Sequence, residues 1–245
     1  MLQYKKSIKR RVALMKYDKI VNGTFISRPN RFIAQVEIDG IMETVHVKNT
    51  GRCKELLVPG ARVYLSESDN IKRRTKYDLV AVEKQKSDGE CRLINMDSQI
   101  VNDVAMELLT EKLFKGYTIK REVTYKSSRF DFYIEGEGRK IFLEVKGVTL
   151  ENDGVASFPD APTERGIKHL KELIHSQGEG FEAFVLFIVQ MNGVKSFCPN
   201  DITHKAFGDA LREASDSGVT VLAVDCVVTP DVITYNDYIR VSLSG

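Results

Sequence analysis

The chain has 245 residues, of which 42% are hydrophobic and 29% charged, enough for one large or two small domains with hydrophobic cores. No segment approaches the roughly 18 to 20 consecutive apolar residues of a membrane span, and the first residues lack the apolar stretch of a signal peptide. We therefore expect a cytoplasmic protein that does not enter a membrane. The four cysteines and four histidines lack the spacing of zinc sites or disulfide frameworks.

Charge is divided unevenly along the chain. Residues 1–100 hold 20 Lys and Arg against 12 Asp and Glu, net +8, whereas residues 101–245 hold 16 against 22, net −6. A basic half suits a polyanion, and an acidic half that approaches the same polyanion needs a local cation to neutralise its carboxylates. A solvated charged surface explains the asymmetry equally well.

The first predicted elements are five short strands within residues 17–86, after a basic extension at residues 1–16. Their sequences are IVNGTFIS, RFIAQVEIDG, IMETVHVKN, ARVYLSE and YDLVAVEKQ. Turn residues, among them Asp39-Gly40 and Pro59-Gly60, separate the strands. Five such strands predict a small barrel of the oligonucleotide-binding (OB) type, in which a basic groove with aromatic side chains follows a nucleic-acid strand.

Basic and polar side chains near the turns of this barrel are candidates for nucleic-acid binding. They are Arg28, Arg31, Asn49, Arg52, Lys72, Arg73, Arg74 and Lys76, with Tyr77 as an aromatic candidate. The run IKRRTKYD stands out because its cations repel one another unless solvent or phosphate compensates them. Phe32 is a further aromatic candidate for the groove, although an aromatic residue at a strand position is more often core than stacking platform.

Residues 87–245 are predicted to form a second domain with a mixed α/β sheet. After a polar connector, SDGECRLINMDSQ, helical spacing covers residues 101–116, and three extended segments follow: YTIKREVTYK, SRFDFYIEG and RKIFLEVKGVTL. A helix (about 163–176), a strand (183–190), a helix (about 203–216) and a strand (219–228) complete the order. Uninterrupted apolar strands between helices predict a sheet covered on both faces. The fold class is therefore α+β.

The strand FLEVKGVTL places a carboxylate and an ammonium in an apolar run. Because strand side chains alternate between faces, Glu144 and Lys146 share one face. Asp131, on the preceding strand of the hairpin, is expected beside Glu144. Two adjacent carboxylates repel unless a proton or cation lies between them, and Mg²⁺ accepts such oxygen ligands, with the backbone carbonyl of Val145 as a further candidate. The alternative is an ordinary surface ion pair.

Several strings carry a resemblance to known proteins. The order of elements with Asp131, Glu144 and Lys146 resembles the PD-(D/E)xK nuclease superfamily, although Phe130 stands where the superfamily's signature proline precedes the aspartate. A narrower resemblance, to the sugar fermentation stimulation protein A (SfsA) family, covers residues 17–225. It rests on RFIAQVEIDG, VHVKNTGRCKELLVPG, KREVTYK, SRFDFYI, EVKGVTL and FPDAPTERGIKHLKEL. Residues 1–14 have no recognised counterpart, so Met15 is an alternative start.

This resemblance implies an OB barrel, a nuclease-like domain and DNA binding. It also implies Asp131 and Glu144 as ligands of Mg²⁺ or Mn²⁺, and Lys146 as the catalytic lysine. A regulatory role in sugar (maltose) metabolism is proposed for the family's bacterial founder.

The segment FPDAPTERGIKHLKEL predicts a helix entry with Thr163 as its cap. Arg165, Lys168 and His169 would then surround the metal strand, and Arg165 at the helix N-terminus suits a phosphate. His169 either carries a proton or is satisfied at a helix–sheet interface. Four residues remain secondary or solvated candidates: Asp160 is a further carboxylate or a turn residue, Glu122 is an outer carboxylate, and Glu107 and Glu111 are expected to be solvated.

The sequence thus predicts a protein that binds DNA, or RNA, and carries a Mg²⁺-dependent phosphodiesterase site. A metal at that site would polarise the scissile phosphate and lower the pKa of a bound water. The alternative is a non-catalytic DNA-binding regulator that uses the nuclease fold as a scaffold. A small-molecule enzyme is less well supported, because the chain lacks a glycine-rich phosphate loop. The sequence leaves the oligomeric state open, a dimer included.

Overall fold

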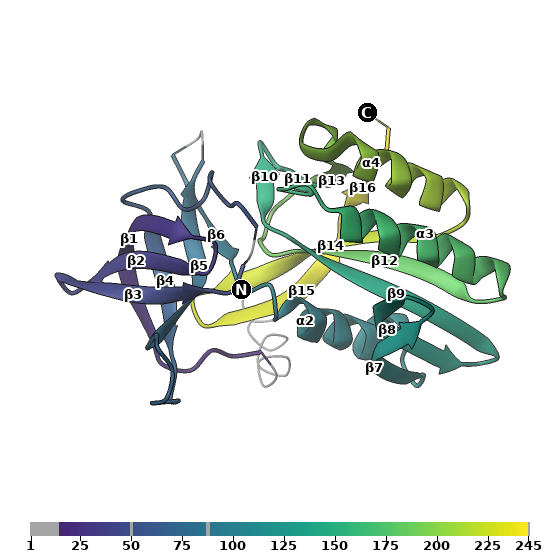
Figure 1. The fold of residues 1–245 in the computed structure, drawn as a ribbon, viewed down its shortest axis with the longest axis horizontal. Helices are drawn as coiled ribbons and strands as arrows, with labels where there is room; N and C mark the ends of the chain where they lie inside the picture. The colour runs from purple at the N-terminus through teal and green to yellow at the C-terminus, as the bar shows by residue number, and fades with distance from the viewer. Residues whose placement is uncertain (1–14, 50, 87–88, 245) are drawn as a thin grey trace, which may run out of the picture.

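The computed structural model describes residues 15–49, 51–86 and 89–244 and shows a small barrel beside a larger, helix-covered sheet (Figure 1). Residues 1–14 of the predicted basic extension lie outside the described residues. The end of that extension packs on the sheet domain, where Met15 is buried and Lys16 forms a β-bridge with Val232. None of the helices in the described ranges is long and apolar enough to cross a bilayer.

Five strands close the N-terminal barrel, as predicted. They are β1 (Ile20–Asn30), β2 (Ile33–Ile38), β3 (Ile41–Val47), β4 (Arg62–Glu67) and β5 (Tyr77–Gln85). The strands pair in the order β3-β2-β1-β4-β5, and a parallel pairing of β3 with β5 closes the ring. A sixth strand, β6 (Cys91–Asn95), extends antiparallel from β5, where the sequence had indicated only a polar connector.

Side chains that point inward at alternate positions of the strands fill the barrel core, in which Phe25, Val36 and Leu65 are almost fully buried. The core position that the sequence favoured for Phe32 was wrong, because its side chain is 44% exposed. Phe32 lies in the turn between β1 and β2, one residue before β2 begins. The inward and outward alternation of the strand does not constrain a residue in a turn, so this aromatic side chain faces solvent.

The C-terminal domain is built on a mixed six-stranded sheet in the order β15-β14-β12-β9-β8-β7. Its strands are β7 (Thr118–Tyr125), β8 (Ser128–Gly136), β9 (Arg139–Val148), β12 (Glu182–Val189), β14 (Thr220–Thr229) and β15 (Val232–Tyr238). Strands β9, β12 and β14 run parallel, whereas β7, β8 and β15 run antiparallel to their neighbours. The predicted mixed sheet is confirmed, with β15 as an unforeseen edge strand.

Helices cover both faces of this sheet (Figure 1). They are α2 (Val101–Leu108), which continues as a π-helical turn η1 (Leu109–Leu113), α3 (Glu164–Gly178) and α4 (Asp201–Asp216). Leu108 of α2 packs in one core with Leu143, whereas Leu173 of α3 packs in the other core with Phe142, the neighbour of Leu143 on β9. Adjacent residues of one strand therefore serve opposite layers, as strand geometry requires.

A second, smaller sheet was not predicted. It contains β10 (Leu150–Asn152), β11 (Val155–Phe158), β13 (Ser196–Pro199) and β16 (Arg240–Val241) in that spatial order. It fixes the chain between the end of β9 and the start of α3. The barrel and the sheet domain meet nearby, where buried Gln190 donates to the Asn95 side chain at 2.9 Å and to the Asp97 carbonyl at 3.0 Å.

Candidate active site and nucleic-acid surface

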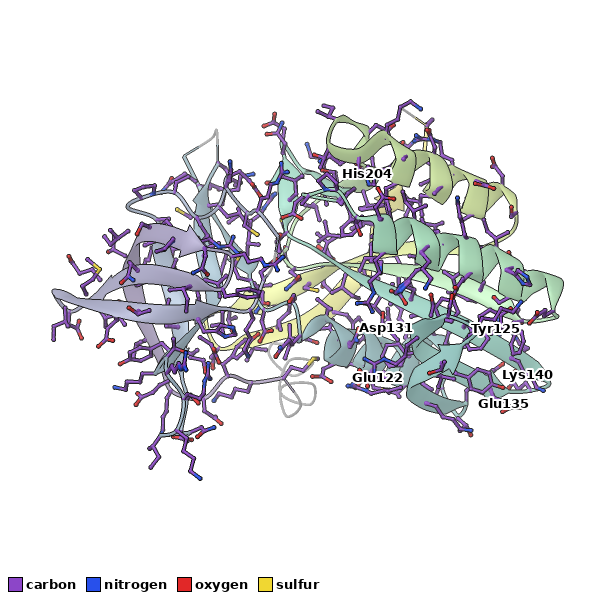
Figure 2. The ribbon with its side chains drawn as sticks, in the orientation of Figure 1. Glu122, Tyr125, Asp131, Glu135, Lys140 and His204 are labelled. Atoms are coloured by element: carbon purple, nitrogen blue, oxygen red, sulfur yellow. The ribbon has the colours of Figure 1, made fainter. Side chains whose placement is uncertain are left out.

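Asp131 on β8 and Glu144 on β9 come together where the two strands separate. The paired residues of β8 and β9 end at Phe132 opposite Leu143. Beyond that point the Asp131 carboxylate replaces the strand partner, and its Oδ2 accepts the Val145 backbone N–H at 2.8 Å. Figure 2 shows Asp131 in the middle of the domain, whereas Glu135 and Lys140 lie at the end farthest from the barrel.

A second donor orients Asp131 from helix α2. The Asn102 side-chain amide donates to Asp131 Oδ1 at 3.0 Å. Sequence reasoning missed Asn102, because an asparagine in the first turn of a helix usually faces solvent or caps the helix. Each carboxylate oxygen has two lone pairs, so both oxygens of Asp131 retain one for a further partner such as a cation.

The two carboxylates have pKa values displaced in opposite directions. Burial, reinforced by the nearby Glu144 charge, raises the pKa of Asp131. Burial also acts to raise the pKa of Glu144, but Lys146 and His169 outweigh it and hold that pKa below its ordinary value. Groups whose environments separate their pKa values in this way are typical of functional sites.

Glu144 has one satisfied and one free oxygen. Its Oε1 contacts the Lys146 ammonium at 2.5 Å and also the Nδ1 atom of His169. Its Oε2 is buried and has no hydrogen-bond partner. A buried carboxylate oxygen without a partner is costly and is the atom that a cation would satisfy.

His169 links the strand to helix α3. The Arg165 side chain donates to His169 Nε2 at 3.3 Å, which leaves the Nδ1 proton directed at Glu144. His169 is 4% exposed. The sequence left open whether His169 carries protons or is satisfied at an interface; the structure places it at the helix–sheet interface, bonded to the candidate metal ligand.

The residues fit a hard divalent cation. Asp131 and Glu144 supply oxygen atoms, one of them buried and unpaired, and such cations complete their coordination with backbone carbonyls and water. In the described part of the chain, no group of three or more His, Cys, Asp and Glu residues is arranged to hold a metal. A cation held by Asp131 and Glu144 would take its remaining ligands from backbone carbonyls, water or substrate.

The start of α3 follows the sequence prediction. Thr163 Oγ1 accepts the Gly166 N–H at 3.1 Å and caps the helix. A Cβ atom at Gly166 would lie 2.9 Å from Thr163 Oγ1 and 3.1 Å from the Phe207 ring of α4, so glycine leaves room for the cap and for α4. Arg165 and Lys168 are exposed, and the Lys168 ammonium donates to the Ser127 carbonyl in the turn before β8.

Arg28 has a structural role in the barrel. Its guanidinium donates to four backbone carbonyls, those of Arg31, Asn49, Gly51 and Arg52, at 2.7 to 2.9 Å. These bonds hold the loop after β3 against the β1–β2 turn. Because its terminal nitrogens are engaged in this way, Arg28 is poorly placed for the phosphate contact that the sequence predicted.

Arg73 is likewise engaged. It forms a two-point contact with buried Asp78, at 2.9 and 2.5 Å, and Asp78 also contacts His46 and Lys48. Tyr77 is buried, and Lys76 contacts Glu67. The predicted candidates that remain exposed on the barrel are Arg31, Arg52, Lys72, Arg74 and Lys76, and Asn49 is half-buried.

The secondary candidates are dispersed. Glu122 is exposed in a left-handed conformation and faces Arg129 at 3.5 Å. Asp160 lies near the barrel, where its Oδ2 is 3.4 Å from the Cys53 backbone nitrogen. Glu107 contradicts the prediction of a solvated residue, because it is buried and accepts from Thr234 at 2.7 and 2.8 Å. Glu111 is exposed, as predicted.

Comparison with known proteins matches both halves of the chain to family models. The model described as the SfsA N-terminal OB domain matches residues 26–91, and the model of the sugar fermentation stimulation protein RE domain matches residues 99–232. A sugar fermentation stimulation protein homolog of Clostridium beijerinckii is 57% identical over 231 residues, which cover 94% of this chain and 100% of that protein. A homolog of Desulfitobacterium hafniense is 57% identical over 230 residues, with 94% and 99% coverage.

A solved structure is also similar. SfsA of Pyrococcus furiosus, in complex with Ca²⁺, superposes with a TM-score of 0.83 at 28% identity, and the match covers 94% of this chain and 98% of that one.

Proposed function

The chain belongs to the sugar fermentation stimulation protein family, and on that premise we propose that it binds nucleic acid and hydrolyses phosphodiester bonds with a divalent cation, Mg²⁺ or Mn²⁺. The observation that carries the proposal is the unpaired, buried Oε2 of Glu144 beside Asp131, whose pKa is raised by burial and by Glu144. The Pyrococcus relative was solved in complex with Ca²⁺, a hard cation that takes oxygen ligands.

In the proposed reaction Asp131 and Glu144 would hold the cation, with Asn102 orienting Asp131 and His169 orienting Glu144. The cation would supply a bound water of lowered pKa and polarise the scissile phosphate. Lys146, whose ammonium lies 2.5 Å from Glu144 Oε1, would neutralise negative charge that develops on the phosphoryl oxygens. Arg165 and Lys168, exposed on α3, offer charge to the flanking phosphates.

The regulator without catalysis remains the second candidate, supported by one observation. The described residues contain no group of three or more His, Cys, Asp and Glu side chains arranged to hold a metal ion. A protein that only binds DNA would need no such group.

The deciding experiment is calorimetric titration of Mn²⁺ into the parent, Asp131→Asn and Lys146→Ala proteins, followed by cleavage assays on single-stranded, duplex and branched DNA and on RNA. We expect Asp131→Asn to lose metal binding and cleavage, and Lys146→Ala to lose cleavage while it still binds metal. Asp209→Asn and Lys205→Ala, on the exposed surface of α4, are charge-matched controls. A parent protein that takes up no divalent ion and cleaves nothing in the panel would leave the regulator as the function.

A further inference from the structure

A cavity of about 390 Å³ lies between the two domains. Barrel residues, including Arg31 and Asn49, form one wall, and the segment from the end of β9 to the start of α3 forms the other. Gly147, next in sequence to Lys146, lines the cavity, as does Thr163, two residues before Arg165. The cavity therefore opens along the same elements that carry the candidate active site.

The chemistry of this junction cavity suits a nucleobase rather than a phosphate. Among the described residues that line it, Arg31 and Asp160 are the charged ones, and they are of opposite sign. Hydrogen-bonding groups and apolar surfaces make up the rest, among them the polar Asn49, Ser98, Thr149 and Gln190 and the apolar Val148, Phe158, Pro159 and Pro162. A base that leaves its stack is held by such combinations of apolar contact and hydrogen bonds to its edge.

An aromatic side chain stands next to the cavity. Phe32 is 44% exposed on the barrel surface, and the guanidinium of its neighbour Arg31, a cavity-lining residue, lies over the ring at 4.8 Å from its centre. Exposed aromatic rings and arginine planes stack against unpaired bases, and any base can take part because each has a π face. Paired bases in a duplex do not present that face.

From these observations we infer that the substrate of this protein is single-stranded nucleic acid, or the single-stranded part of a larger one. One unpaired base stacks at Phe32 and Arg31, and a neighbouring base enters the junction cavity. The backbone then continues to Asp131, Glu144 and Lys146. The inference rests on the proposed nucleic-acid binding, and it specifies the strand state of the substrate, which the active-site geometry alone does not.

The test compares a fluorescent single-stranded 20-mer with a duplex of the same length, by anisotropy in EDTA, so that cleavage plays no part. We expect the parent to prefer the single strand and Phe32→Ala to lose about 5- to 150-fold in affinity for it, with little change for the duplex. Phe32→Tyr should retain the affinity. Met42→Ala, which removes another exposed apolar side chain of the barrel, should change neither.

The cavity is tested separately by filling it. Ala161, a partly exposed lining residue, is replaced in Ala161→Leu and Ala161→Phe, so that the smaller change serves if the larger one does not fold. Both should weaken single-strand binding, and an abasic oligonucleotide should bind the parent less tightly than the intact one. Single-strand affinity at the parent level in a folded Ala161 variant would overturn the cavity assignment.

The outcomes separate this inference from the proposed function. Equal affinity for both strand states, with Phe32→Ala affecting both or neither, overturns the inference while nucleic-acid binding stands. A parent that binds no DNA and no RNA in either strand state overturns the proposed function itself. The same oligonucleotides made as RNA show whether the protein binds DNA or RNA more tightly.

Discussion

Each domain contains a buried cluster of acidic and basic side chains. The two clusters differ in how completely their carboxylate oxygens are hydrogen-bonded. In the barrel, Asp78 receives Arg73 on both oxygens, His46 at 2.9 Å and Lys48 at 3.7 Å. These contacts outweigh burial and lower the Asp78 pKa. In the sheet domain, Glu144 keeps a buried oxygen without a partner, and the pKa of Asp131 is raised.

The difference shows what each cluster is built for. A carboxylate whose lone pairs all accept hydrogen bonds or face a cation adds to stability and has no free lone pair with which to bind a ligand. An unsaturated pair is held at a cost in free energy that the rest of the fold must offset, as is typical of sites that await a ligand. Sequence composition does not distinguish the two, because in both a carboxylate on a strand has basic residues within a few positions of it.

The largest expected effect comes from removing a ligand charge at the unsaturated cluster. Asp131→Asn should lower metal-dependent cleavage on the order of a thousandfold, because a bound cation contributes several kcal/mol to charge stabilisation. Asp78→Asn should leave the cleavage of a small phosphodiester, which does not need the barrel, near the parent rate. Comparable losses in both variants would mean that the two clusters are not functionally distinct.

His169 tests whether the unsaturated cluster depends on its supporting contacts. His169→Leu removes the donor to Glu144 and should cost about 10- to 100-fold in metal affinity, as loss of a residue that orients a metal ligand does. His169→Asn keeps a donor near the Nδ1 position and should recover part of the loss. Mn²⁺ titration by calorimetry, with melting temperatures recorded for both variants, checks this prediction. Equal affinities for the two variants would assign His169 to packing alone.

Stability should respond in the opposite sense at the two aspartates. Asp78→Asn weakens charge-assisted hydrogen bonds and should cost about 1–3 kcal/mol in the free energy of unfolding at neutral pH. Because the folded pKa of Asp78 is lowered, its contribution is present above its unfolded pKa and is lost as pH falls through the folded value. The difference between parent and variant should therefore shrink below about pH 4.

For Asp131 the sign reverses. Its folded pKa is raised, so its contribution is present below the unfolded pKa and is lost as pH rises through the folded value. At neutral pH, without metal, Asp131→Asn should be as stable as the parent or more stable. Urea unfolding of both variants at several pH values measures this contrast. If Asp131→Asn is destabilised as much as Asp78→Asn, the predicted difference between the two aspartates is wrong.

The smallest expected effect lies on the barrel surface. Arg74 is exposed, whereas Arg73 is bound to Asp78. Arg74→Ala should lower the slope of log affinity against log salt by about 0.7 to 0.9, the value of one phosphate contact. Arg73→Ala should instead destabilise the barrel. Binding titrations of both variants in rising KCl test this prediction. A slope unchanged in Arg74→Ala would exclude the segment IKRRTKYD from the nucleic-acid surface.

The sequence by itself determined the class of fold and the order of most elements. Period-two alternation between turn residues gives the five barrel strands, and uninterrupted apolar strands between amphipathic helices give the covered sheet. It also placed Glu144 and Lys146 on one face of β9, because that placement depends only on the alternation of a strand. The Thr163 cap followed from local chemistry in the same way.

Only the tertiary structure decided which charges are free. Arg28 and Arg73 resemble Arg31 and Arg74 in the sequence, yet distant carbonyls and Asp78 occupy the first two. Asn102, 29 residues from Asp131, and His169, 25 residues from Glu144, reach the site through packing of helices on the sheet. Hydrogen bonds between residues far apart in the chain leave no periodic signal, so the partners of a buried charge, and hence its role, appear only when the layers are assembled.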